Sequence, residues 1–265
     1  MAEIPSLPQR AFVVGAQRRE ELASAFQSDA ESYDKIRPSY PQEALDFTLQ
    51  HRPATAVDIG CGSGIFTEQL VSAGLEVTAV DPSADMLSVL SKRLPQIEVV
   101  CATGEATGLA ADSADLVTYA QAWHWVDHPQ ASAEAARLLR DGGWLTLLWN
   151  QLDVTVPWVH RLARIMHAGD VHRPELEPPL GPQFQKPEHG IWHWSMELDF
   201  HEIIELTKSR SYYRKSSDTT RAKVEANLAW YWHEHLGHEP DKKVQVPYLT
   251  HAWRSRRRPR RRPRR

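Results

Sequence analysis

The sequence predicts an α/β protein in which a mostly parallel sheet carries helices on both faces. Between residues 55 and 150, short apolar segments alternate with amphipathic segments of helical periodicity, a pattern typical of βαβ units. Three glycines closely follow the first apolar segment, in "VDIGCGSGIF" (57–66). Because crossovers between parallel strands are right-handed, such units place a ligand crevice at the carboxyl ends of the strands.

Local signals set the order of the expected elements. A helix begins near Pro41, and Gly74 ends the next one. Pro82 lies in the first turn of a further helix, whose last turn holds Lys92 and Arg93. Parallel strands are expected at 55–60, 76–81, 97–102, 114–120 and 144–150, with helices at 64–74, 82–94 and 128–143.

The pattern loosens after residue 150. A proline-rich segment, 172–190, is expected to form a loop or a lid. Asp199 and Glu202 resemble a capping box at the start of a short helix, and Gly237 ends a longer one. Two alternating segments predict an antiparallel terminal hairpin, which makes the sheet seven-stranded. These strands are expected at 191–198 and 243–254, and the helices between them at 199–213 and 218–237.

Composition is that of a globular protein. The chain has 265 residues, of which 42% are hydrophobic and 25% charged. No apolar run reaches about 18 residues, so no membrane-spanning helix is expected, and the N-terminus lacks the apolar segment of a secretory signal. The only two cysteines, Cys61 and Cys101, exclude a disulfide framework and favour a reducing, cytoplasmic setting.

Charge is unevenly distributed along the chain. Residues 256–265 contain eight arginines and two prolines, so removing them takes the net charge from −3 to −11 for residues 1–255. Prolines and like charges oppose folding, which predicts a disordered Arg/Pro tail. Three interpretations are open: an extension without a role, attachment to nucleic acid or an acidic membrane, and association with the acidic remainder of the chain.

The glycine loop has the spacing acid-x-Gly-x-Gly-x-Gly, formed by Asp58, Gly60, Gly62 and Gly64. Glycine lets the chain turn from strand to helix with no Cβ between backbone and ligand. A dinucleotide fingerprint would require glycine where Ile65 stands, and a P-loop would require a following lysine. The remaining interpretations are a different nucleotide ligand and a tight turn without a ligand.

Asp81 closes the second expected strand, 17 residues after Gly64. A carboxylate at this position can accept hydrogen bonds from the 2′- and 3′-hydroxyls of a ribose. Its alternative role is to cap the helix that begins at Pro82. The two roles are compatible, because a cap at the carboxyl end of a strand also faces the crevice.

In this order, the motifs resemble the class I S-adenosylmethionine-dependent methyltransferases, and among them the type-11 group that includes trans-aconitate-methyltransferase-like proteins. The motifs are the glycine loop, Asp81, "ATGEA" (102–106) and "AQAWHWVD" (120–127), and the resemblance spans about residues 26–254. It implies a Rossmann-like domain over 46–255. Within it, 54–150 would bind the cofactor and 151–255 would cover the substrate, while 1–45 would form a lead-in that caps the cofactor.

The resemblance implies S-adenosyl-L-methionine as the cofactor. The three glycines would pass under its methionine and ribose, Asp58 would organise the loop and approach the amino group, and Asp81 would bind the ribose diol. The implied cofactor-binding residues are Tyr33, Arg37, Asp58, Gly60, Gly62, Gly64, Asp81, Thr103, Gly104, Glu105 and Gln121.

The other residues of this implied site have less specific roles. Thr103, Gly104 and Glu105 would lie beside the adenine, although this group commonly has alanine where this chain has Gly104. Gln121 would lie near the sulfonium, and Tyr33 and Arg37 would fold over the cofactor, with Arg37 a partner for its carboxylate. The alternatives are a surface role for Arg37 and a turn cap for Glu105.

The stretch "AWHW" (122–125) suggests an acceptor site. Trp123 and Trp125 are candidates for the walls of a substrate pocket, and an aromatic face favours a nearby sulfonium. His124 is the candidate catalytic residue, either as a general base or by orienting the acceptor. The alternative is that the tryptophans pack the crevice rim and His124 makes a structural hydrogen bond.

No metal site is expected. His233, His235 and His238 lack the zincin spacing and do not share one helical face, which favours solvated side chains. The expected function is therefore methyl transfer to a small-molecule acceptor by in-line displacement. The alternatives are a nicotinamide-dependent oxidoreductase, a protein that binds S-adenosylmethionine without catalysis, and an RNA methyltransferase assisted by the basic tail.

Overall fold

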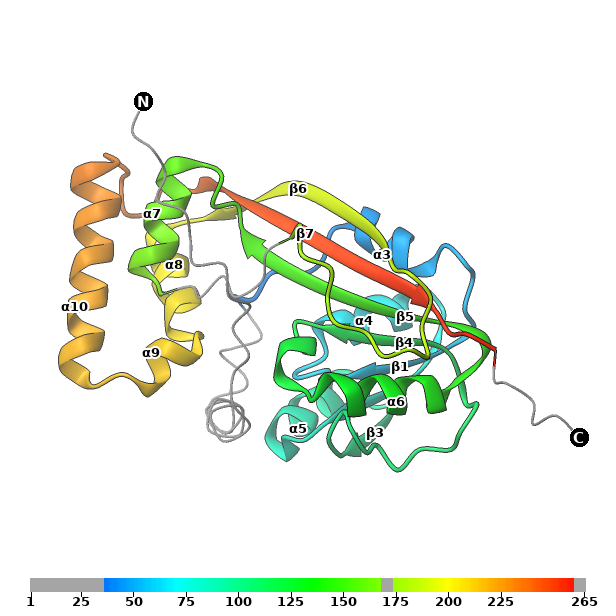
Figure 1. Ribbon diagram of the computed structural model, residues 1–265. Coiled ribbons are helices and arrows are strands. Elements are labelled where there is room, and N and C mark those ends of the chain that lie inside the picture. Colours follow the sequence, from blue (N-terminus) through cyan, green and yellow to red (C-terminus); the bar gives the residue numbers. More distant parts are fainter. Residues whose placement is uncertain (1–35, 168–173, 260–265) are drawn as a thin grey trace, which may run out of the picture.

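The computed structural model describes residues 36–167 and 174–259, which form a seven-stranded sheet flanked by helices (Figure 1). The strand order is β3-β2-β1-β4-β5-β7-β6. The first five of these strands are parallel, while β7 runs antiparallel to both β5 and β6. The predicted parallel sheet with a terminal antiparallel hairpin is therefore confirmed. The strands are β1 (Thr55–Ile59), β2 (Glu76–Asp81), β3 (Glu98–Cys101), β4 (Ala114–Ala120), β5 (Leu139–Leu152), β6 (Glu188–Leu198) and β7 (Val244–Arg256).

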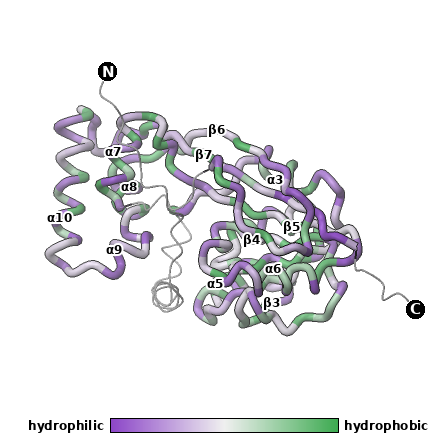
Figure 2. Tube along the Cα trace, in the orientation of Figure 1, coloured by the Kyte–Doolittle hydropathy of each residue, from purple (hydrophilic) through white to green (hydrophobic). Residues whose placement is uncertain are grey.

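Helices cover both faces of the parallel strands. Ala56 and Leu116 pack with α3 and α4, whereas their neighbours Val57 and Val117 pack with α6, as the two-residue period of strands requires. Figure 2 shows hydrophobic residues along the inner strands of the sheet. The helices are α3 (Gln42–Leu49), α4 (Ile65–Ser72), α5 (Ala84–Arg93), the 3₁₀-helix η2 (Trp123–Trp125), α6 (His128–Leu138), α7 (Pro157–Ile165), α8 (Phe200–Lys208), α9 (Ser211–Lys215), α10 (Asp218–Ala229) and the π-helix η3 (Trp230–His235).

A second hydrophobic cluster lies beyond the carboxyl end of β5. Helices α7, α8 and α10 contribute apolar side chains to it, together with the adjacent ends of β5, β6 and β7. We call the group of helices α7, α8, α9, α10 and η3 the helical subdomain, and Figure 1 shows it displaced from the parallel strands. The capping box at its α8 is confirmed, because Asp199 accepts a hydrogen bond from the Glu202 N–H and Glu202 accepts one from the Asp199 N–H.

Two predicted helices have other boundaries in the structure, and a third changes its geometry part-way. Helix α6 ends at Leu138 rather than at the glycine pair, because residues 140–143 form an irregularity where β5 pairs with β4. There a Cβ on Gly143 would lie 3.0 Å from a backbone carbonyl oxygen. The predicted helix 199–213 divides into α8 and α9, and the predicted helix 218–237 changes from α to π geometry at Trp230.

The first arginines of the predicted tail belong to the fold. Strand β7 continues to Arg256, and the side chain of Arg257 is 2% exposed. The Arg257 guanidinium lies 2.9 Å from the carboxylate of Asp112 and 3.5 Å from that of Asp141. Residues 256–259 are thus folded, whereas the rest of the predicted tail, 260–265, lies outside the described residues.

The described part of the proline-rich segment, 174–187, has little regular structure. It packs against α6 and the end of β7. The backbone N–H of Gly181 donates to the Ser132 hydroxyl of α6 at 3.0 Å, and the Phe184 ring is buried in the core. This loop therefore packs on the same face of the sheet as α6.

Candidate functional site

The glycine loop connects β1 to α4 through three residues of positive φ, +69° at Gly60, +55° at Gly62 and +92° at Gly64. A Cβ at Gly60 would lie 2.4 Å from the Cβ of Ala122, and a Cβ at Gly64 would lie 2.2 Å from Leu90. At Gly62 an added Cβ would meet nothing within 4 Å. The outer glycines thus permit close packing, whereas the middle one presents backbone to open space.

Asp58 lies beneath this loop and is fully buried. Its two carboxylate oxygens accept hydrogen bonds from the hydroxyls of Thr67 in α4 and Thr118 in β4, both at 2.7 Å. Burial raises the pKa of Asp58 to about 6, although these hydrogen bonds oppose the shift. The predicted role in organising the loop fits this geometry, but the buried carboxylate has no surface with which to approach a cofactor.

Asp81 joins the glycine loop to the end of β2. One carboxylate oxygen accepts a hydrogen bond from the Gly62 N–H at 2.9 Å, and the other accepts one from the Ser83 N–H at 2.8 Å. Burial raises the pKa of Asp81. The N-cap of α5 is Ser83, whose hydroxyl accepts from the Met86 N–H, so Asp81 does not cap this helix.

The residues after β3 make mainly structural contacts. The Tyr119 hydroxyl donates to the Gly104 carbonyl at 3.1 Å, and an added Cβ at Gly104 would lie 3.1 Å from two apolar side chains. An alanine at this position would therefore have to displace its neighbours by a few tenths of an ångström. The Glu105 carboxylate accepts from the N–H of Asp127, the N-cap of α6, at 2.8 Å, which matches its alternative role, and Thr103 is exposed.

Gln121 follows β4 in a backbone conformation that non-glycine residues rarely adopt. Its φ is +56°, a type of strain that clusters at functional sites. The side-chain amide donates to the Asn150 carbonyl at the end of β5 at 2.5 Å, so Gln121 bridges the carboxyl ends of two strands.

The "AWHW" stretch separates into core and rim. Trp123 is 1% exposed and packs on Tyr119 and His128, which places it in the core, and its role in a substrate pocket stays a prediction. Sequence could not show which tryptophan faces inward, because the 3₁₀-helix η2 has no repeating face. Trp125 is half-buried beside the His124 ring, and His124 accepts a hydrogen bond from the Trp149 indole N–H at 3.4 Å.

The described part of the lead-in, 36–41, runs across the carboxyl end of β5. Ile36 packs in the helical subdomain, and the Arg37 guanidinium donates to the Ser209 carbonyl there at 3.0 Å. The Asn150 side-chain amide then donates to the Ser39 carbonyl at 3.1 Å. This segment therefore joins the end of β5 to the helical subdomain. Tyr33 lies outside the described residues.

Asn150 is a site residue that sequence reasoning missed. Its carbonyl binds Gln121, its amide N–H binds the lead-in, and its side-chain oxygen accepts from Thr250 of β7 at 2.5 Å. The available signal was a polar residue at the end of the apolar segment "WLTLLWN" (144–150).

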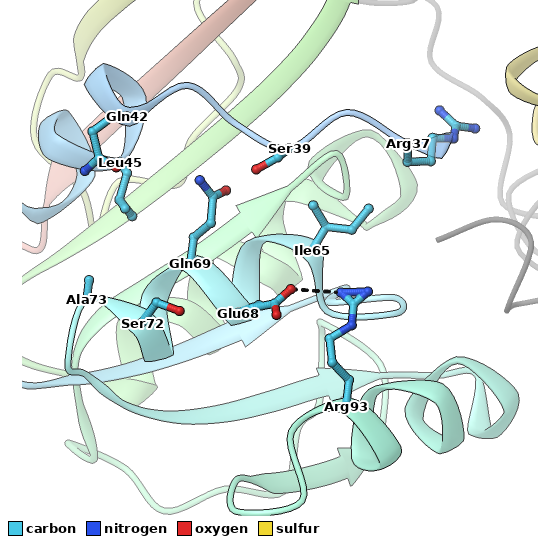
Figure 3. Close-up of a pocket in the computed structure, with 10 residues that line it drawn as sticks. All are labelled: Arg37, Ser39, Gln42, Leu45, Ile65, Glu68, Gln69, Ser72, Ala73 and Arg93. Atoms are coloured by element: carbon cyan, nitrogen blue, oxygen red, sulfur yellow. Dashed lines mark hydrogen bonds and ion pairs between the residues drawn. The ribbon is translucent and has the colours of Figure 1, made fainter. Parts of the chain in front are cut away.

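A cavity of about 490 Å³ lies between the lead-in, α3, α4 and the end of α5 (Figure 3). An ion pair joins Arg93 and Glu68 at its wall, with a nitrogen–oxygen distance of 3.2 Å. The loop glycines and the two buried acids do not line it. The cavity lies beside α4, and two residues of the lead-in, Arg37 and Ser39, contribute to its lining.

The three C-terminal histidines do not meet as a group in the described chain. His233 contacts the His238 carbonyl oxygen at 2.8 Å. Within residues 36–167 and 174–259, no three His, Cys, Asp or Glu side chains could together hold a metal ion. In the same part of the chain, no helix is long and apolar enough to cross a membrane.

Comparison with known proteins decides the family. The sequence profile of a methyltransferase domain matches residues 57–147. An uncharacterized methyltransferase of Mycobacterium tuberculosis is 37% identical over 233 residues, which cover 88% of this chain and 95% of the relative. This chain belongs to the methyltransferase family.

Other relatives of this methyltransferase extend the likeness. An uncharacterized methyltransferase-like protein of Schizosaccharomyces pombe is 31% identical over 216 residues, covering 77% of this chain and 84% of that protein. Among solved structures, a provisionally named type II methyltransferase from Anaeromyxobacter dehalogenans has a TM-score of 0.69 at 25% identity, covering 84% of this chain and 99% of that one.

A more distant structure shares only the fold. The Haemonchus contortus phosphoethanolamine N-methyltransferase 2, in complex with phosphomonomethylethanolamine and S-adenosylhomocysteine, has a TM-score of 0.51 at 15% identity. The match covers 96% of this methyltransferase and 62% of that chain.

Proposed function

We propose that this methyltransferase transfers a methyl group from S-adenosyl-L-methionine to a small-molecule acceptor. The observation that carries the proposal is the juxtaposition of Gly62 and Asp81. The middle glycine presents backbone to open space, and a carboxylate at the end of β2 lies within hydrogen-bond distance of its N–H. This combination fits a nucleoside, because the glycine leaves room for the ligand and the carboxylate accepts from a ribose diol.

The proposed cofactor site extends from this pair across the strand ends. The loop glycines, Gly60, Gly62 and Gly64, would contact the cofactor through their backbone. Asp81 would accept hydrogen bonds from the ribose hydroxyls, and the buried Asp58 would hold the loop in position. The segment Thr103–Glu105 would lie beside the adenine, with Gln121 toward the sulfonium. The S-adenosylhomocysteine in the fold neighbour from H. contortus supports this choice of cofactor.

Arg37 and Tyr33 complete the proposed site as its cap. Arg37 reaches the helical subdomain, so it lies on the path that would close the crevice, and a guanidinium suits the carboxylate of the cofactor. We propose the same division of the chain as the motifs predict: a cap within 1–45, a cofactor-binding core at 54–150 and substrate-covering elements at 151–255.

The chemistry proposed for the protein is chiefly positional. S-adenosylmethionine supplies a methyl group that is already activated by its sulfonium. The residues around the crevice then need to hold the acceptor in line and to exclude water, and such positioning lowers the barrier by several kcal/mol. Trp125 and His124 lie beside each other at the end of β4, where they could contact the acceptor. A carboxylate acceptor would require no base.

A small molecule is a better proposed acceptor than RNA. The RNA alternative depended on the arginine-rich segment, yet Arg257 is buried against two aspartates and Arg258 donates to the Phe184 carbonyl at 2.7 Å. These two arginines are engaged within the fold, which reduces the basic surface that RNA could contact.

The test uses S-adenosylmethionine with an isotopically labelled methyl group. The full chain would be incubated with separate small carboxylic acids, including trans-aconitate, and with phenols, amines and RNA. We expect label in a small-molecule product, its loss in Asp81→Asn, and its retention in Glu76→Gln, which alters an exposed acid at the opposite end of β2. Label only in RNA would establish the RNA alternative, and S-adenosylhomocysteine binding without transfer to any acceptor would indicate a non-catalytic binding protein.

A further inference from the structure

The side chain of Trp149 determines how His124 can act. Its indole N–H donates to Nδ1 of His124, with 3.4 Å between the two nitrogens. His124 belongs to η2 at the end of β4, whereas Trp149 belongs to the neighbouring strand β5. The contact therefore links the candidate catalytic residue to the rigid sheet.

Trp149 is held firmly in its position. It is 2% exposed and lies in the hydrophobic core that α6 covers. Its ring stacks on that of His251, directly opposite it on β7, with 5.1 Å between ring centroids and 13° between ring planes. An indole can only donate, so the atom that Trp149 faces must offer a lone pair.

A neutral imidazole carries one proton, on one of its two nitrogens. Since Nδ1 of His124 accepts from Trp149, the proton lies on Nε2. A general base at Nε2 would need the opposite tautomer, with the proton on Nδ1. In that tautomer the Nδ1–H of His124 would face the indole N–H of Trp149, and two donors form no hydrogen bond with each other.

We propose that Trp149 is a positioning residue that holds His124 as a hydrogen-bond donor through Nε2–H. In this tautomer His124 cannot remove a proton from the acceptor through Nε2, because that nitrogen has no free lone pair. This inference rests on the proposed function and narrows it to acceptors that do not depend on His124 as a general base at Nε2.

The test is the protonation state of the His124 ring nitrogens. Long-range ¹H–¹⁵N NMR spectra of the full chain with ¹⁵N-histidine distinguish protonated from unprotonated ring nitrogens, and His124→Gln assigns the signals. In the wild type at a pH where the ring is neutral, we expect the proton on Nε2. In Trp149→Phe, which keeps a ring against His251 but removes the donor, the tautomer ratio should fall by roughly tenfold, the equivalent of one hydrogen bond.

Trp144→Phe is the matched control. Trp144 also lies in β5 and stacks on a histidine, His51, with 3.9 Å between ring centroids, but it makes no hydrogen bond to His124. The variant Trp144→Phe should therefore leave the NMR signals of His124 unchanged. A proton on Nδ1 in the wild type would overturn the proposal without any variant, and an unchanged ratio in Trp149→Phe would also overturn it.

Calorimetric titration with S-adenosylhomocysteine on the same wild-type sample separates the two proposals. Absence of binding with the proton on Nε2 would refute the proposed cofactor and leave the role of Trp149 in fixing the tautomer standing. Binding with the proton on Nδ1 would retain the cofactor and refute the donor role of His124.

Discussion

Alanine substitutions in the glycine loop should separate its structural from its binding role. Each of Gly60, Gly62 and Gly64 has positive φ, where alanine is strained by about 1–2 kcal/mol. Only at Gly60 and Gly64 would the new Cβ also clash, at 2.4 Å and 2.2 Å, and overpacking costs about 1–3 kcal/mol more. We therefore expect losses in the free energy of unfolding of about 1–2 kcal/mol for Gly62→Ala and about 2–5 kcal/mol for the other two.

Relative to the stability that each variant loses, Gly62→Ala should weaken cofactor binding more than Gly60→Ala or Gly64→Ala. The Cβ of Gly62→Ala enters the open space that we assign to the cofactor, so this variant should lose at least about tenfold in S-adenosylhomocysteine affinity, or 1.4 kcal/mol. Gly74→Ala is the matched control. It has a φ of +90° with nothing within 4 Å of the added Cβ, but it lies at the other end of α4. It should lose similar stability and keep its affinity.

Urea unfolding and calorimetric titration measure the two effects. Ala122→Gly removes the atom that clashes with Gly60→Ala, so the double variant should regain the overpacking part of the loss and keep the backbone strain. Wild-type affinity in Gly62→Ala would refute the assignment of the open space. Equal destabilisation by Gly60→Ala and Gly62→Ala would refute the packing argument.

Three further predictions concern stability. The pKa of Asp58 is about 6 in the folded chain, above its usual 3.8, so its contribution is greatest below pH 3.8 and falls by roughly 3 kcal/mol as pH rises through 6. Asp58→Asn should remove this part of the pH dependence in urea unfolding from pH 4 to 8; an unchanged profile would contradict it. Arg257→Ala should cost about 1–3 kcal/mol, because the buried Leu139 carbonyl loses its donor while the partner carboxylates of Asp112 and Asp141 are exposed. The exposed Arg256→Ala should cost less, and equal thermal midpoints would refute that difference. Asn150→Ala should speed amide hydrogen exchange in residues 36–41 without affecting α6, because it removes the hydrogen bond from Asn150 to the Ser39 carbonyl. Unchanged exchange in residues 36–41 would show that other contacts hold the lead-in in place.

The parallel core could be predicted because its elements are locally encoded. Alternating strand and helix periods, together with Pro82 in a first turn and Gly74 at a helix end, indicate βαβ units without reference to distant residues. The terminal hairpin could also be predicted, because polar and apolar residues alternate along its strands. The end of α6 was not, since the glycine pair looks like a helix stop until its close approach to β4 is known.

In the candidate site, contacts within one motif could be predicted from the sequence, whereas contacts between separate strands could not. The glycine loop and Asp81 are adjacent through the fixed order of β1 and β2. The links from Trp149 to His124 and from Asn150 to the lead-in join elements whose contact only the fold determines. Arg257 was assigned to a tail because composition alone does not reveal a strand that continues into basic sequence.

The most direct test of the account is calorimetric titration of S-adenosylhomocysteine into the wild type and Asp81→Asn, with Glu76→Gln, at the opposite end of β2, as control. The account predicts one site per chain, unchanged in the control. In Asp81→Asn the affinity should fall by about 10- to 100-fold, the value of a hydrogen bond to a charged group. Failure of the wild type to bind, or equal affinity in Asp81→Asn, would contradict the account.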